Sequence, residues 1–231
     1  MEGEMIRPAN YIPLFEVGGV QINLSESICV QWIVVVILLC LFAFLGRKLE
    51  VRPTGLRQTL AETIVEFFQN TVRDSMGEKF KGFTPYIGAL FCMSLISNLM
   101  GLLGFRTPTS DLSVVGAWGI TTFVMVQVTK IRTGGAFAPI TSLSQPVAFM
   151  TPFNIIGEFA NPASQTLRHF GNMVAGLAIG SLIYSSLGHF AILVPAAASL
   201  YFDLFAALVQ AFIFMSLTMA YVSSADCSAD G

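Results

Sequence analysis

The sequence predicts an all-α integral membrane protein with about five membrane-embedded helices and one amphipathic surface helix. Of its 231 residues, 54% are hydrophobic and only 11% are charged, whereas soluble domains carry about 25% charged residues. The apolar residues gather into runs of roughly twenty, which is the length a helix needs to cross a bilayer. This composition excludes a soluble globular protein, and we expect no nucleic-acid partner.

We expect one membrane domain over residues 1–231. A cleavable signal peptide is not expected, because the first apolar run begins only near Ile28. The expected segments are a first span (28–46), an amphipathic surface helix (55–76), a second span (85–104), a third span (112–128), a long tilted helix (151–186) and a last span (196–222).

Basic residues after the first span set the expected orientation. Arg47, Lys48, Arg52 and Arg57 follow residues 28–46. The positive-inside rule therefore places this side in the cytoplasm and the N-terminus outside.

The helix expected over residues 55–76 is amphipathic, because apolar residues recur at helical spacing and charged residues fill the other face. We expect it to lie on the cytoplasmic surface of the membrane. Packing against a soluble partner is the alternative.

A short polar turn separates the second and third spans. The second span includes Asn98 in ISNLMGLLG, and FRTPTSD follows with Ser110 or Asp111 as the candidate N-cap of the third span. Lys130 and Arg132 close the third span on the cytoplasmic side.

Thr151 and Pro152 are placed to cap and start the long helix, which is expected to run to residue 186 with one interruption at Pro162. About 35 residues at ~1.5 Å each give roughly 50 Å, which exceeds a ~30 Å bilayer core. The helix must therefore tilt, bend or lie partly at the interface. The last span then leaves a short acidic tail in the cytoplasm.

Arg168 is the only Lys or Arg between Thr133 and the end of the chain. A basic residue in the middle of a membrane helix costs roughly 2.5–3.5 kcal/mol, so it is a functional hypothesis by default. Steps of three and four residues place a polar stripe on one face of the helix. Its members are Glu158, Asn161, Gln165, Arg168 and Asn172, with Ser164 and His169 at its border.

Two interpretations of Arg168 remain open at this point. It could pair with Asp203 or Glu158 as a buried link between helices, or it could face a binding or moving anion along an aqueous path. In the last span Asp203 and Gln210 are seven residues apart and share a face. The pattern supports an ion path without choosing between a channel, a carrier and a rotary stator.

No metal site or cofactor is expected from the cysteines. The sequence has no CxxC pair, and three of the four cysteines lie in apolar helix patterns, where they act as small hydrophobic residues. The four are Cys29, Cys40, Cys92 and Cys227.

The sequence FNIIGEFANPASQTLRHFGNMVAG, followed by LVQAFIFMSLTMAYVS, resembles subunit a of the F-type ATP synthase membrane sector. ISNLMGLLG and TPTSD extend the resemblance to nearly the whole chain. It implies an ion-translocating stator subunit that forms two half-channels against the c-ring and couples proton or sodium flow to ring rotation and ATP synthesis. Such a subunit has no catalytic site of its own, because ATP is made or hydrolysed on other subunits.

The implied partners are the c-subunit ring carboxylates, the peripheral-stalk b subunits and the lipid bilayer, within a large hetero-oligomer of a bacterial cell membrane. The alternative is an autonomous ion channel or secondary transporter. Many such transporters contain inverted repeats, and none is apparent in this sequence.

The resemblance also assigns ion-translocation residues. Arg168 matches the family's essential arginine, Asn172 and Gln210 match the polar residues near it, and Glu158 matches the acidic residue of the same long helix.

Three positions depart from the common bacterial pattern. Leu177 replaces a glutamate and Asp203 replaces a histidine, so Asp203 is the candidate acid of this version. His169 replaces a residue that is usually apolar. It is interpreted as a packing or hydrogen-bonded histidine, with a titrating role near neutral pH as the alternative.

Overall fold

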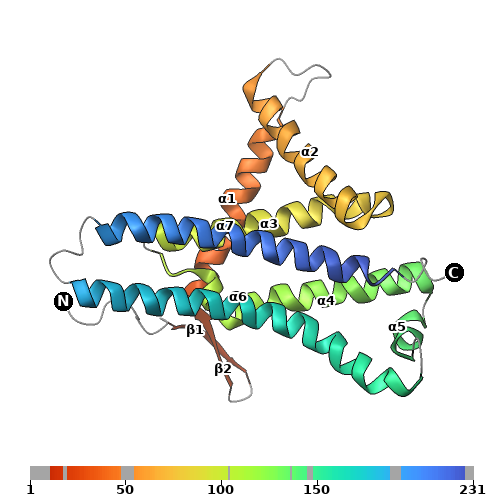
Figure 1. The fold of residues 1–231 in the computed structure, drawn as a ribbon. Coiled ribbons are helices and arrows are strands. Elements are labelled where there is room, and N and C mark those ends of the chain that lie inside the picture. The colour runs from red at the N-terminus through yellow and green to blue at the C-terminus, as the bar shows by residue number, and fades with distance from the viewer. Residues whose placement is uncertain are drawn as a thin grey trace.

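The computed structural model describes residues 11–17, 20–47, 55–103, 105–135, 137–144, 148–187 and 194–226. Four long helices lie side by side, with α3 packed on α7 and α4 on α6, and α1 and α2 project from them as a wedge (Figure 1). The main helices are α1 (Glu26–Leu45), α2 (Leu56–Met76), α3 (Thr84–Leu99), α4 (Leu112–Gly134), α6 (Thr151–Leu187) and α7 (Val194–Ser223), with the short α5 (Ala138–Thr141) between α4 and α6.

Among the described residues, four helical segments are long and apolar enough to cross a membrane. They are Glu26–Leu45, Glu78–Leu103, Leu112–Gly134 and Leu204–Ser223. Large apolar side chains such as Trp32 and Ile120 are 69% and 66% exposed, as expected for surfaces that face lipid. The predicted class, a helical integral membrane protein, is confirmed.

A small β-hairpin precedes the helices and was not predicted. Strand β1 (Tyr11–Val17) pairs antiparallel with β2 (Val20–Ser25), with Val17 opposite Val20. Ser25 ends the hairpin and caps α1, because its Oγ accepts a hydrogen bond from Ser27 N. The same hydroxyl donates to Asp111 Oδ2 at 2.9 Å, which ties the hairpin to the start of α4.

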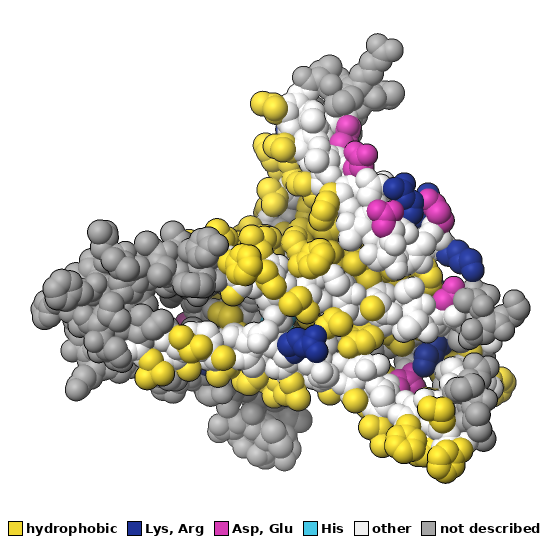
Figure 2. Space-filling view, in the orientation of Figure 1, with side chains coloured by type: hydrophobic (Ala, Val, Ile, Leu, Met, Phe, Trp, Pro, Cys, Tyr) yellow, Lys and Arg dark blue, Asp and Glu magenta, His cyan; other side chains and the backbone are white. Residues whose placement is uncertain are grey.

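Helix α2 is amphipathic, as predicted from its periodicity. Phe68 and Val72 are buried in a core cluster with Ile87 of α3 and Met215 of α7, whereas Leu56 on the same helix is 84% exposed. Acidic and basic side chains gather over α2 and at the neighbouring end of the molecule (Figure 2). The position of α2 on the membrane surface stays a prediction.

Helix α6 has 37 residues, which at ~1.5 Å per residue gives about 55 Å. It begins at Thr151, as predicted, but the predicted interruption at Pro162 is wrong, because the helix continues through this residue. A proline removes one backbone hydrogen bond and crowds the carbonyl four residues earlier. A helix can bend and still continue there, and α6 changes direction along its length (Figure 1).

Helices α4 and α6 approach each other closely at Gly119. A side-chain carbon added there would overlap Thr166 Oγ1 and lie 3.2 Å from the carbonyl oxygen of Pro162. The Thr166 hydroxyl is itself fixed, since it donates to that carbonyl at 2.8 Å. The two helices can therefore pack at this distance only because position 119 lacks a side chain.

Candidate functional site

Arg168 lies near the middle of α6 with its side chain exposed. It makes no hydrogen bond or ion pair with any residue that the structure describes. Arg168 is the only Lys or Arg of α6, and Figure 2 shows the Lys and Arg side chains on this face of the molecule in dark blue. A charge in a membrane protein that has no partner among the described residues points to an external partner or to water.

One turn beyond Arg168, α6 is joined to α7 by a polar contact. Asn172 Nδ2 donates to Gln210 Oε1 at 2.8 Å. Gln210 is 9% exposed and Asn172 is exposed. The structure therefore brings together Asn172 and Gln210, two predicted site residues that come from two separate sequence motifs.

Small side chains flank Arg168 along one side of its exposed face. Ser164, Gly171 and Ala175 are all exposed and lie at helical spacing beside it. Small residues allow another helix to approach a membrane helix closely. This face can accept a neighbouring helix whose polar group reaches the guanidinium.

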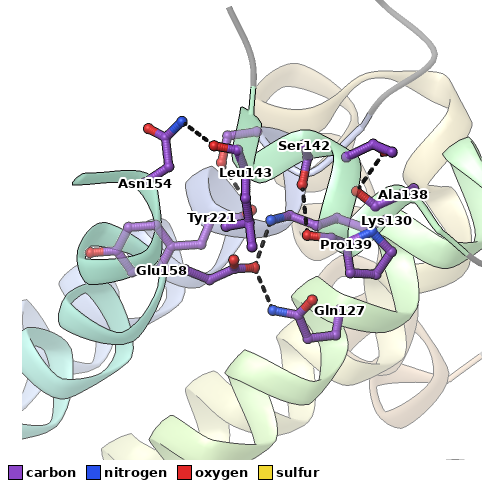
Figure 3. A network of polar contacts seen from close by, with 11 residues as sticks. Gln127, Lys130, Ala138, Pro139, Ser142, Leu143, Asn154, Glu158 and Tyr221 are labelled. Carbon is purple, nitrogen blue, oxygen red and sulfur yellow. Dashed lines mark hydrogen bonds and ion pairs between the residues drawn. The ribbon is translucent and has the colours of Figure 1, made fainter. Parts of the chain in front are cut away.

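Glu158 of α6 belongs to a second polar cluster, which it forms with Gln127 and Lys130 of the neighbouring helix α4. Lys130 Nζ lies 2.6 Å from Glu158 Oε1, and Gln127 Nε2 donates to the same oxygen (Figure 3). The Lys130 and Glu158 side chains are only 14% and 12% exposed. The predicted alternative in which Arg168 pairs with Glu158 is therefore wrong, since Lys130 occupies the carboxylate.

Lys130 and Glu158 line a cavity of about 380 Å³ between α4, α6 and the end of α7, whose other polar lining residues include Asn154, Asn161 and Tyr221. Asn154, also in the lining, donates to the Leu143 carbonyl at 2.8 Å (Figure 3). The sequence interpretation missed Gln127 and Lys130 as site residues. Their spacing of three residues on one helix face was the available signal.

His169 lies on the buried side of α6, about 100° around the helix from the exposed Arg168. Its ring is fully buried and contacts Trp118 of α4 and Phe214 of α7 edge to face, with ring centroids 5.8 and 5.3 Å away. Neither ring nitrogen has a hydrogen-bond partner among the described residues. The structure therefore does not place the imidazole with Arg168 or with the pair of Asn172 and Gln210.

The predicted single polar stripe is divided between two faces. Gln165 is 2% exposed and donates to the Phe214 carbonyl at 3.1 Å and to Thr218 Oγ1 at 3.0 Å on α7. Arg168, by contrast, faces outward. A helix has 3.6 residues per turn, so a step of three residues falls short of a full turn and a step of four passes it. Members of one stripe can therefore fall on both sides of a helix interface.

Two predicted positions are not characterised at the side-chain level. Asp203 and Leu177 belong to α7 and α6, but their side chains lie outside the described residues. Within the part of the chain that the structure describes, no group of three or more His, Cys, Asp or Glu side chains could hold a metal ion.

The fold and this site define a class of protein. The chain is an integral membrane protein of several helices, in which one long helix presents an exposed arginine beside an amide pair bridging to the last helix. Residues 28–223 match the family described as ATP synthase A chain. The chain belongs to this family.

Individual relatives agree with this assignment. The chain is 37% identical to "ATP synthase subunit a, sodium ion specific" of Propionigenium modestum, over 83% of this chain and 70% of the relative. It is 30% identical to ATP synthase subunit a of Moorella thermoacetica, over 95% and 96% of the two chains. ATP synthase subunit a of Geobacter sulfurreducens is also 30% identical, over 94% and 96%. Members of this family are subunits of a hetero-oligomer in a bacterial membrane, and the chain is therefore one component of a larger complex.

Proposed function

We propose that the chain is the ion-translocating stator subunit of an F-type ATP synthase, in which Arg168 faces the carboxylates of a rotating c-ring. The observation that carries the proposal is the exposed guanidinium of Arg168, unpaired among the described residues and flanked by small side chains. An anion supplied by another subunit satisfies this charge. Peripheral-stalk b subunits hold the chain fixed while the ring turns.

The mechanism follows from the energies of charges in lipid. A ring carboxylate that has bound an ion is neutral and can turn through the hydrocarbon region, whereas a charged one is strongly disfavoured there. When the carboxylate returns to Arg168, the nearby positive charge favours its ionised form and releases the ion. The same charge repels cations and blocks a direct leak. One charge crossing 100 mV releases about 2.3 kcal/mol, so several ions cross for each ATP.

Two half-channels reach Arg168 from opposite sides of the membrane. The cavity at Glu158 lies near Lys130, at the end of α4 that carries the basic residues, and it forms the cytoplasmic half-channel. The contact between Asn172 and Gln210 lies on the other side of Arg168 along α6, where Asp203 of α7 supplies an acid. In this orientation the N-terminus is outside and the C-terminus is cytoplasmic.

The transported ion is a proton or Na⁺, and the ring carboxylate site selects between them. One relative carries "sodium ion specific" in its name. Na⁺ is therefore tested alongside the proton, by measuring whether Na⁺ stimulates ATP hydrolysis by the purified complex.

The direct test is ATP-driven ion pumping by complexes that carry Arg168→Ala or Arg168→Lys. Both variants are expected to abolish pumping; lysine fails because a guanidinium stays charged whatever its burial, whereas a buried ammonium can lose its proton. Arg132→Lys, at an exposed arginine at the end of α4, is the control and retains pumping. Normal coupled pumping by either Arg168 variant contradicts the proposal.

An autonomous channel or secondary transporter is the second candidate function. Reconstitution of the purified chain distinguishes it from a stator subunit. A stator subunit purified alone into liposomes shows no ion-specific transport. Ion-specific transport by the isolated chain would favour the second candidate.

A further inference from the structure

Buried polar atoms without hydrogen bonds gather between α4, α6 and α7. Thr122, Gln165 and His169 are 1%, 2% and 0% exposed. Thr122 Oγ1, Gln165 Oε1 and both nitrogens of His169 lack a hydrogen-bond partner among the described residues. Thr122 also interacts with the Tyr86 hydroxyl of α3, although the two oxygens do not meet hydrogen-bond geometry. Buried polar groups in proteins are almost always paired, by protein or by ordered water.

These atoms lie in order along one helix interface. Gln127 contacts Glu158, and Trp118, earlier on α4, contacts His169, later on α6. The two helices therefore run antiparallel, and these contacts mark two levels along their shared interface. Thr122 lies one turn from Trp118, and Gln165 lies one turn from His169 on the same face. Both therefore fall between the two levels.

The cavity beside Glu158 reaches the start of this series. Its lining includes Thr122 from α4, and Asn161 and Pro162 from α6. Beyond Thr122, the next unpaired polar atoms along the interface, away from Glu158, are those of Gln165 and then His169. The rings of Trp118 and Phe214 then contact the imidazole edge to face and close the series.

We infer that Thr122, Gln165 and His169 line a hydrated path that extends the cavity at Glu158 into the helix interior and ends at His169. The ligand is water. A hydroxyl, an amide oxygen and an imidazole together offer the two to four polar partners that a buried water needs. A histidine serving only as packing between Trp118 and Phe214 would leave two ring nitrogens unsatisfied, which an apolar side chain of similar size would avoid.

The path gives the imidazole contact with the cytoplasmic side, although the neighbouring Arg168 faces outward. This deepens the proposed function and rests on it for the direction of ion flow. The hydration of the path does not depend on pumping, so the two can be tested apart.

The test measures the reactivity of a thiol introduced by His169→Cys in the assembled complex. The four native cysteines are first replaced by serine, and inside-out vesicles are treated with 2-aminoethyl methanethiosulfonate. Labelling is read from the mass of the purified chain. The control is Val115→Cys, a fully buried position on α4 that lies one turn beyond Trp118, away from the cavity. We expect the thiol at position 169 to react at least tenfold faster than the thiol at position 115; equal rates overturn the inference.

A second pair of variants tests the route. Thr122→Val, added to His169→Cys, removes one hydroxyl at constant shape and is expected to slow labelling at least fivefold. Thr121→Val is the matched control, because Thr121 is exposed and its one hydrogen bond among the described residues is to the Ala117 carbonyl. This variant leaves the rate unchanged. Equal effects of the two valines overturn the inference.

If His169→Cys does not assemble, Thr122→Cys takes its place against the same Val115→Cys control. Slow labelling in complexes that pump normally overturns the path and leaves the stator proposal standing. Fast labelling together with normal pumping by Arg168→Ala supports the path and overturns the stator proposal.

Discussion

Lys130 Nζ lies 2.6 Å from Glu158 Oε1, and both side chains are nearly buried. The contact joins α4 to α6 across 28 positions of sequence. Each charge is therefore compensated by the other, and protein atoms cover most of both side chains. Removing one partner leaves a buried charge, whereas removing both leaves none.

Lys130→Met is accordingly expected to destabilise the protein by about 3–5 kcal/mol. Adding Glu158→Met is expected to recover most of that loss. Thermal unfolding of the purified protein in detergent, followed by circular dichroism, measures the effect. The control is Lys81→Met, which breaks a pair with Glu78 whose side chains are 61% and 62% exposed and which should cost at most about 1 kcal/mol. Equal losses at Lys130 and Lys81 would contradict the burial argument.

Gly119→Ala should destabilise the packing of α4 on α6 by about 1–3 kcal/mol, because the new carbon overlaps Thr166 Oγ1. Gly116→Ala on the same helix meets no atom within 4 Å and should be neutral or stabilising by up to about 1 kcal/mol, since alanine favours helix. The same unfolding measurement compares the two. Adding Thr166→Ala to Gly119→Ala should restore stability, and a failure to restore it would mean that the overlap is not the cause.

Of the two predicted candidates, Ser110 and Asp111, it is Asp111 that caps α4: its Oδ1 accepts a hydrogen bond from Ser113 N at 3.0 Å, while Oδ2 accepts from Ser25. Asp111→Ala removes both contacts and should cost about 0.5–2 kcal/mol from the cap alone. Hydrogen exchange should therefore accelerate at the first turn of α4 and at the start of α1. Asp111→Asn keeps an acceptor at the cap, so it should leave the α4 amides protected; acceleration there by asparagine would count against the capping role.

The hydrogen bond from Asn172 to Gln210 predicts an energetic coupling between α6 and α7. A neutral hydrogen bond contributes about 0.5–1.5 kcal/mol, so Asn172→Ala and Gln210→Ala should be non-additive by roughly this amount. A double-mutant cycle on thermal stability measures the coupling. Strict additivity would show that the two amides act independently.

The helices could be predicted from the sequence because apolar runs and basic residues mark where they begin and end. The expected long helix over 151–186 corresponds to α6 at Thr151–Leu187, and only the interruption at Pro162 was wrong. The hairpin was missed although YIPLFEV and VQINLS flank two glycines, a recognised hairpin signal. VQINLS also alternates strictly between apolar and polar residues, so the strand signal was present in the sequence, whereas YIPLFEV alternates less regularly.

The site was predicted only in part, for a geometric reason. Periodicity places Arg168 and Gln165 on neighbouring positions of one face, but the helix interface runs between them, and sequence spacing does not locate that boundary. Neither does it reveal that Lys130 meets Glu158, since that contact depends on how α4 packs on α6. The proximity of Asn172 and Gln210 could be anticipated, because the family resemblance places both residues near the same arginine.

The central claim is that the exposed face around Arg168 meets a ring of carboxylate-bearing helices, and site-specific photo-crosslinking tests it most directly. A photoreactive residue at Leu167, which is 58% exposed beside the arginine, is expected to capture a small membrane protein with a buried carboxylate in the assembled complex. The same residue at Ile120, which is 66% exposed on α4, serves as the control and should capture lipid instead. No adduct from Leu167, or the same ring adduct from both positions, would contradict the account.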